Sequence, residues 1–227
     1  MELRLRCLQI DLARQKERAD FVKSYADLAA ESGYNALILY LENAVRTEDT
    51  AFFDREDTYS AEEISEIVDY AESLGLDVIP AFENLGHLEK FFCYKELESF
   101  SEIEDAAFEG RGFDNYKRGA CGCVTNPALR AFMDKYITDV CSLFRSKYVH
   151  MGLDEPFDLA VCGRCKAAAA EKGKSELFYE HIMHTYELCR NLGRTMMMWD
   201  DFFEYADLAE RLPRDITVSY THLTLPT

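Results

Sequence analysis

Residues 147–155 read Lys147-Tyr148-Val149-His150-Met151-Gly152-Leu153-Asp154-Glu155. A short apolar run leads into a glycine and then into two adjacent carboxylates. A run of this length and composition predicts a buried strand, which places both acids at its carboxyl end. Because neighbouring carboxylates repel each other, one tends to have a raised pKa, and this separation suits paired acid and anion roles. An acidic helix cap after a strand has the same local sequence, so the rest of the chain decides between the two interpretations.

Polar residues follow four further apolar runs in the same way. These runs, at residues 5–12, 35–41, 77–82 and 195–199, are each predicted to form a strand. The polar residues at the five strand ends are Asp11 with Arg14, Glu42 with Asn43, Glu83 with His87, His150 with Asp154 and Glu155, and Trp199 with Asp200 and Asp201. Five successive strand ends therefore carry side chains that suit binding or catalysis.

Helical patterns separate the predicted strands, and a sixth strand begins near Ile216. The predicted helices span residues 17–32, 61–74, 127–144, 174–192 and 203–212. In the first of them, Phe21, Tyr25, Leu28 and Ala29 share the face that we expect to be buried. Strands that alternate with helices predict parallel β-α-β units.

Two architectures share this alternation, the doubly wound sheet and the (β/α)8 barrel. A doubly wound sheet gathers its site at one switch point, whereas a barrel builds its site from all of its strand ends. The polar strand ends favour the barrel, and no glycine-rich phosphate loop follows the first strand. A complete barrel takes about 250 residues, so we expect an incomplete TIM barrel, α/β in class, with about five and a half units in this chain.

The charge and the hydropathy exclude two classes of partner. The chain carries 42 acidic and 25 basic residues, for a net charge of −17. Such a surface repels phosphate backbones, so no nucleic-acid partner is expected. No stretch approaches the roughly 20 apolar residues of a membrane helix, so no membrane partner is expected either. The first residues lack the apolar core of a signal peptide, which predicts a cytoplasmic protein.

The last residues, 218–227, do not fit the pattern of the chain before them. They read Val-Ser-Tyr-Thr-His-Leu-Thr-Leu-Pro-Thr and resemble one reading frame of a transposase adaptor used in sequencing libraries. We therefore predict a partial TIM-barrel catalytic domain over residues 1–217 and a non-native, adaptor-derived tail over residues 218–227. The alternative is a genuine strand of threonines and leucines.

Five segments together resemble the catalytic domain of glycoside hydrolase family 20, the β-N-acetylhexosaminidases. Residues 147–155 are similar to the family's His-x-Gly-x-Asp-Glu motif, although Leu153 stands where the family often has a second glycine. The other four matches, in the family's order, are Asp11-Leu12-Ala13-Arg14, the segment Ile79 to His87, Cys123-Val124-Thr125-Asn126-Pro127, and Met196 to Asp201. Each lies at or just beyond a predicted strand end.

The resemblance implies a hydrolase that removes terminal N-acetylglucosamine or N-acetylgalactosamine from an oligosaccharide or glycoconjugate, without a cofactor. Substrate-assisted retaining hydrolysis would use Glu155 as the acid and then the base, while Asp154 orients the 2-acetamido group. The substrate-binding residues implied are Arg14 and Glu42 for sugar hydroxyls, His87 and His150 to brace the carboxylates, Trp199 to stack on the sugar, and Asp201. Further sugar contacts would lie on the seventh and eighth strands, so we expect this chain alone to be inactive.

Two other functions remain open from the sequence. A non-catalytic sugar-binding barrel would keep the pocket without the chemistry, although the presence of both acids argues against it. A zinc-stabilised interaction module would use the loop cysteines Cys121, Cys123, Cys162 and Cys165. We expect free thiols there rather than zinc, with a disulfide as a further alternative, and ordinary buried thiols at Cys7, Cys93, Cys141 and Cys189.

Overall fold

The computed structural model describes residues 5–103, 120–200 and 208–219. The chain forms two compact units. The first contains Met1–Phe82 with Asp134–His150, and the second contains Glu83–Met133 with Met151–Thr227. Within the described residues, no helix has both the length and the apolar character needed to cross a membrane.

The first unit contains four parallel strands in chain order, β1 (Cys7–Asp11), β2 (Ala36–Tyr40), β3 (Asp77–Ala81) and β4 (Tyr148–His150). Every residue of β2 is buried, as its continuous apolar run predicted. The predicted strands are thus confirmed, each shortened by one to three residues. Because β1, β2 and β3 are parallel, their carboxyl ends lie at the same edge of the sheet. The predicted polar residues follow these strand ends.

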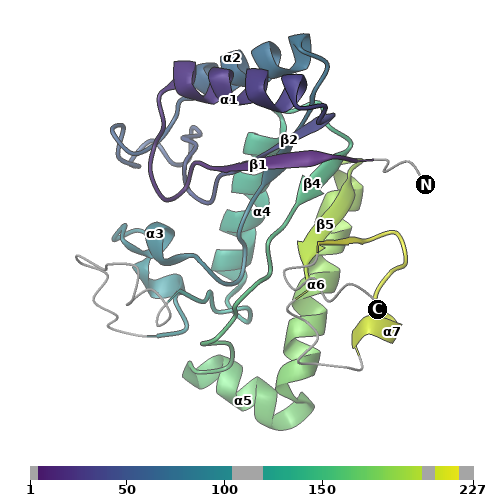
Figure 1. Cartoon of the computed structure of the whole chain (residues 1–227). Helices are drawn as coiled ribbons and strands as arrows, with labels where there is room; N and C mark the ends of the chain where they lie inside the picture. Colours follow the sequence, from purple (N-terminus) through teal and green to yellow (C-terminus); the bar gives the residue numbers. More distant parts are fainter. Residues whose placement is uncertain (1–4, 104–119, 201–207, 220–227) are drawn as a thin grey trace. The chain divides into compact units, whose positions relative to one another are not determined.

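Two helices of the first unit, α1 (Ala19–Glu31) and α2 (Ala61–Ser73), lie side by side over the strands (Figure 1). A capping box begins α2, in which the Glu63 backbone N–H donates to Ser60 Oγ and the Ser60 N–H donates to the Glu63 carboxylate. Both predicted helices are therefore confirmed.

The buried face of α1 differs from the predicted one. Val22, Ala26 and Ala29 are fully buried, whereas Phe21 and Leu28 are each about half exposed. The predicted face was right at Ala29 and wrong at Phe21 and Leu28, because Val22, Ala26 and Ala29 form the buried stripe. The bulkier residues lie on the neighbouring stripe.

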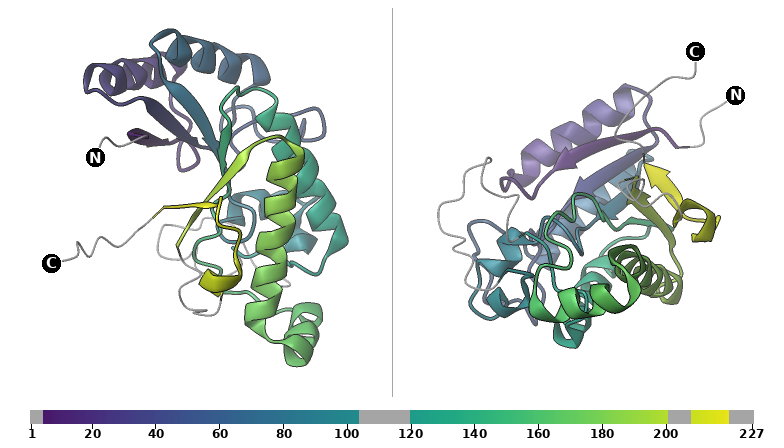
Figure 2. Two further views of the ribbon diagram at one scale, coloured as in Figure 1. Left: turned by 90° about the vertical axis from the view of Figure 1, so that its right-hand side faces the viewer. Right: turned by 90° about the horizontal axis from the view of Figure 1, so that it is seen from below.

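The second unit contains the strands β5 (Thr195–Trp199) and β6 (Thr217–Ser219), which pair in parallel. Its helices are α3 (Glu89–Phe92), the 3-10 helix η1 (Glu98–Phe100), α5 (Gly163–Lys172), α6 (Lys174–Asn191) and α7 (Leu208–Arg211). Figure 2 shows α5 and α6 as consecutive helices, joined at Gly173. Helix α4 (Pro127–Cys141) begins in the second unit and ends in the first.

The sixth predicted strand is present as β6, which includes Val218 and Ser219. Residues 220–227 lie outside the described part of the chain. The domain boundary at residue 217 and the adaptor origin of the tail therefore stay predictions.

Candidate active site

Arg14 is positioned by the turn that follows β1. Asp11 Oδ1 accepts hydrogen bonds from the backbone N–H groups of Ala13 and Arg14, at 2.9 and 3.0 Å. An aspartate that caps its own turn fixes the backbone of the next residues, and this gives the Asp-x-x-Arg spacing a physical reason. The arginine side chain remains partly exposed, at 37%.

The Arg14 guanidinium forms an ion pair with Glu42, whose side chain is fully buried. The Tyr40 hydroxyl donates a second hydrogen bond to Glu42 Oε1 at 2.9 Å. From helix α4, the Tyr136 hydroxyl donates to the backbone oxygens of Glu42 and Val45 at 3.1 and 3.0 Å. Glu42 therefore sits in a rigid, hydrogen-bonded setting that holds Arg14, while its predicted contact with sugar stays a prediction.

In the second unit, His87 lies beside the two predicted catalytic carboxylates. Its Nε2 is 3.3 Å from Asp154 Oδ2 and 3.5 Å from Glu155 Oε2. The Asp154 side chain is 20% exposed and the Glu155 side chain 38%, whereas His87 is buried. One imidazole thus faces both carboxylates, and Glu155 is the more accessible of the two acids.

The loops that carry these residues approach each other through two glycines. A Cβ at Gly86 would lie 2.3 Å from the backbone oxygen of Asp154, and a Cβ at Gly152 would lie 2.1 Å from Glu83 Oε2. Real Cβ atoms do not approach other atoms so closely, so both positions need glycine. The fully buried Glu83 carboxyl therefore belongs to this site. The sequence placed Glu83 at a strand end, among the residues that could hydrogen-bond sugar hydroxyls.

The surroundings of Asp154 favour its ionised form. Burial alone would raise the pKa of this carboxyl, but hydrogen bonding to His87 and to the Glu83 carboxyl outweighs burial and lowers the pKa below its usual value. These contacts therefore favour the anionic form of Asp154.

Backbone strain is concentrated at the site residues. Glu42, His87, Leu153 and Glu155 have φ values of 42°, 51°, 74° and 46°. Residues other than glycine enter this left-handed region at a cost of about 1–3 kcal/mol each and do so mainly where the surroundings enforce it. Leu153, at the position where the sequence departs from the family motif, is fully buried, so packing of its side chain offsets the strain.

Three further predicted site residues, Trp199, His150 and Asp201, are not among the contacts of His87 described above. Trp199, at the end of β5, is partly exposed, and its backbone N–H donates to the oxygen of Gly152 at 3.0 Å, which ties the segment before Asp154 to β5. His150 is buried at the end of β4 in the first unit. Asp201 lies outside the described residues, next to the buried Asp200. The roles predicted for Trp199, His150 and Asp201 stay predictions.

Comparison with known proteins shows the family of the chain. The model of "Glycosyl hydrolase family 20, catalytic domain" matches residues 4–221. A β-hexosaminidase from Vibrio furnissii is 29% identical over 174 residues, which cover 73% of this chain and 27% of that protein. The chain thus spans about a quarter of the length of that relative.

Solved structures show the same fold. The chitobiase of Flavobacterium johnsoniae superposes with a TM-score of 0.81 at 21% identity, over 95% of this chain and 34% of that one. The exo-β-N-acetylglucosaminidase of Vibrio harveyi, in complex with N-acetylglucosamine, superposes with a TM-score of 0.79 at 22% identity, over 97% and 38% of the two chains. The predicted fold class, an α/β TIM barrel of which this chain contains part, is confirmed. Because the family model matches nearly the whole length of the chain, the chain belongs to glycosyl hydrolase family 20.

Proposed function

We propose that the complete protein removes a terminal N-acetylhexosamine residue from an oligosaccharide or glycoconjugate. The single observation that carries this proposal is the arrangement of His87 beside both Asp154 and Glu155, with the pKa of Asp154 lowered. A buried anion next to a more exposed carboxyl supplies the two different groups that substrate-assisted cleavage needs.

The proposed steps assign one role to each of the two carboxyl groups. Glu155 donates its proton to the glycosidic oxygen while the substrate's acetamido oxygen attacks the anomeric carbon, so the bond to the leaving group breaks as a cyclic intermediate forms. Asp154, as the anion, hydrogen-bonds the acetamido N–H and stabilises the positive charge that develops. Glu155 then takes a proton from the water that opens the intermediate, which retains the anomeric configuration.

The proposal assigns substrate binding to residues at several strand ends. Arg14, held by Glu42, presents directed N–H donors to sugar hydroxyls. Trp199 stacks on the sugar face, His150 supports the carboxylates, and Asp201 accepts a hydroxyl hydrogen bond. The crystallised Vibrio harveyi relative was solved with N-acetylglucosamine, and a strongly acidic chain suits a neutral sugar better than a phosphorylated one.

The requirement for an acetamido group tests the function. With the complete protein, a chromogenic N-acetylglucosaminide should be hydrolysed far faster than the matching glucoside, because only the former supplies the internal nucleophile. Asp154→Asn should lose activity on the N-acetylglucosaminide. Equal rates on both substrates, or a glycosyl ester trapped on an enzyme carboxylate, would contradict the proposed mechanism.

A further inference from the structure

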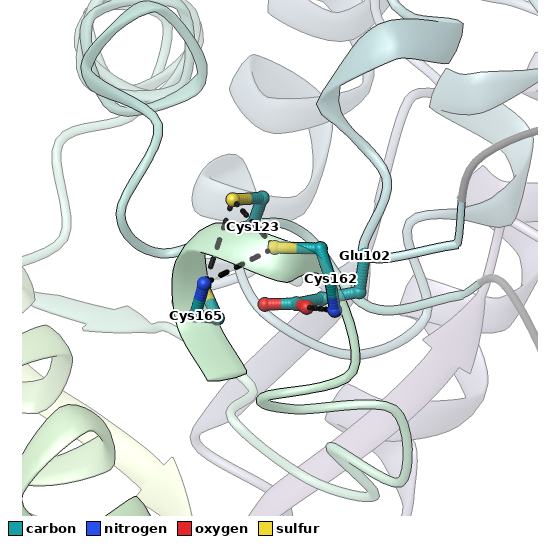
Figure 3. A group of neighbouring side chains, drawn as sticks. All are labelled: Glu102, Cys123, Cys162 and Cys165. Atoms are coloured by element: carbon teal, nitrogen blue, oxygen red, sulfur yellow. Dashed lines mark hydrogen bonds between the residues drawn. The ribbon is translucent and has the colours of Figure 1, made fainter. Parts of the chain in front are cut away.

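A second cluster of reactive side chains, which does not include the proposed acid and base, lies in the second unit. It contains Glu102, Cys123, Cys162 and Cys165, and their ligand atoms all lie within 4.8 Å of one another (Figure 3). Glu102, Cys123 and Cys165 are almost completely buried. We call this group the Cys3Glu cluster.

Two backbone segments bring Glu102 and Cys123 together. Ser101 and Gly122 form an antiparallel bridge. On either side of it, the Glu102 N–H donates to the oxygen of Cys121 and the Cys123 N–H donates to the oxygen of Phe100, both at 2.8 Å. The position of these two side chains is therefore set by main-chain hydrogen bonds.

Cys162 and Cys165 come from the start of α5. Cys162 is the N-cap residue, and its Sγ accepts a hydrogen bond from the Cys165 N–H at 3.3 Å. Glu102 Oε2 accepts from the N–H groups of Val161 and Cys162 at 3.1 and 2.7 Å. Backbone N–H groups thus offset negative charge on the sulfur and on the carboxylate, as hydrogen bonds around metal ligands do.

The separations between the ligand atoms suit a tetrahedral ion. Cys123 Sγ lies 3.4 Å from Cys162 Sγ and 3.6 Å from Cys165 Sγ. Zn–S bonds of about 2.3 Å in a tetrahedron put the sulfur atoms roughly 3.8 Å apart, so shifts of a few tenths of an ångström suffice. Glu102 Oε1 is buried beside the Cys162 and Cys165 thiols, and outside this cluster it accepts no hydrogen bond within the described part of the chain. A buried carboxylate is costly unless it is paired or binds a cation.

We propose that Cys123, Cys162, Cys165 and Glu102 bind one structural Zn²⁺ ion. Four protein ligands close the coordination sphere, which is the pattern of structural rather than catalytic zinc. Binding displaces the protons that remain on the thiols into solvent. The proposal departs from the free thiols expected from the sequence, and it replaces Cys121 by Glu102 in the ligand set.

The ion would fix the loops that carry the catalytic groups. The segment that contains Cys123 pairs with the His87 loop, since the Gly122 N–H donates to the oxygen of Leu85 and the Leu88 N–H donates to the oxygen of Ala120, both at 2.8 Å. Cys162 follows Glu155 by only a short segment of chain. The zinc would therefore join the loop after the acids to the loop that carries the histidine facing them.

The complete protein, purified under reducing conditions, provides the test. Elemental analysis should find about one equivalent of zinc, which a strong chelator removes with a fall in Tm. Cys162→Ser and Glu102→Gln should each lower the bound zinc. Cys93→Ser, at an exposed cysteine, and Cys121→Ser, at a buried cysteine outside the Cys3Glu cluster, should retain it. Replacement of the zinc by Co²⁺ should give thiolate-to-metal charge-transfer absorption and the strong d–d bands of tetrahedral cobalt.

The cobalt spectrum uses the wild-type protein, so it decides the question even where a cysteine variant fails to fold. Protein that purifies without zinc, takes up no Co²⁺ and keeps its Tm in chelator would overturn the proposal. So would a disulfide between any two of the three cysteines in protein that is folded and active. Loss of zinc from Cys121→Ser with retention in Glu102→Gln would overturn the proposed ligand set.

Discussion

The carboxyl group of Glu83 packs against the Cα atom of Gly152, so that a Cβ at residue 152 would lie 2.1 Å from Glu83 Oε2. Glu83 follows β3 and Gly152 follows β4, and Asp154 comes two residues later. The glycine of the His-x-Gly-x-Asp-Glu stretch therefore lets a buried carboxyl group approach the segment that carries the two proposed catalytic acids.

Gly152→Ala should destabilise the protein by more than a positive φ alone explains. Gly152 has φ +66°, and the new Cβ would also collide with Glu83. Gly33→Ala is the matched control, since Gly33 has φ +79° and no atom within 4 Å of its Cβ position. The control should cost about 1 kcal/mol and Gly152→Ala clearly more, by urea denaturation. Equal losses of stability would show that Glu83 does not constrain residue 152.

Removal of His87 should shift the pH dependence of hydrolysis. Burial raises the pKa of Asp154, and hydrogen bonding to His87 is the largest influence that lowers it. In His87→Ala the pKa of Asp154 should therefore rise, and the carboxylate should become protonated at higher pH. The acidic limb of the kcat profile should move to higher pH, because the anion is the active form.

The control for this pH shift is His184→Ala, at a histidine on helix α6. Its acidic limb should coincide with that of the wild-type protein. If His87→Ala lowered kcat with an unchanged pH profile, His87 would not act on the ionisation of Asp154.

Arg14 and Glu42 should be coupled in stability. Arg14→Ala leaves the fully buried Glu42 carboxylate without its guanidinium partner, and an uncompensated buried charge is destabilising, here by about 1–3 kcal/mol because Arg14 is partly exposed. In the double variant Arg14→Ala with Glu42→Gln, much of that loss should be recovered, while sugar binding stays weak. A double-mutant cycle by urea denaturation measures the coupling, and strictly additive losses would contradict it.

Much of the fold follows from the sequence because the signal from the strands was strong. Buried parallel strands give continuous apolar runs, so β2 and β3 were predicted to within one residue at each end. Helix α5 was missed because its alanine- and lysine-rich sequence has no apolar stripe. Cys165 is the residue of this helix that is buried. The face of α1 was right only at Ala29, because the pattern gave more weight to the large residues Phe21 and Leu28 than to Val22 and Ala26.

The candidate site was predicted only in part. The motif placed Asp154 and Glu155 at the end of one predicted strand, and a separate segment placed His87 beyond the end of the preceding strand. Glu102 was missed, since no local pattern links it to cysteines far along the chain, and only the bridge between Ser101 and Gly122 brings it to them. Long-range pairs of this kind depend on the tertiary fold.

The central claim is that Glu155 is the general acid, and the hydrolysis rate of Glu155→Gln in the complete protein tests it most directly. On an N-acetylglucosaminide with a poor leaving group, kcat should fall by about 100-fold or more, because general acid catalysis typically contributes 10² to 10⁴. On a substrate whose leaving group needs no proton, the fall in the first, bond-breaking step should be much smaller. Near-wild-type turnover of the poor-leaving-group substrate would contradict the assignment of Glu155 as the acid.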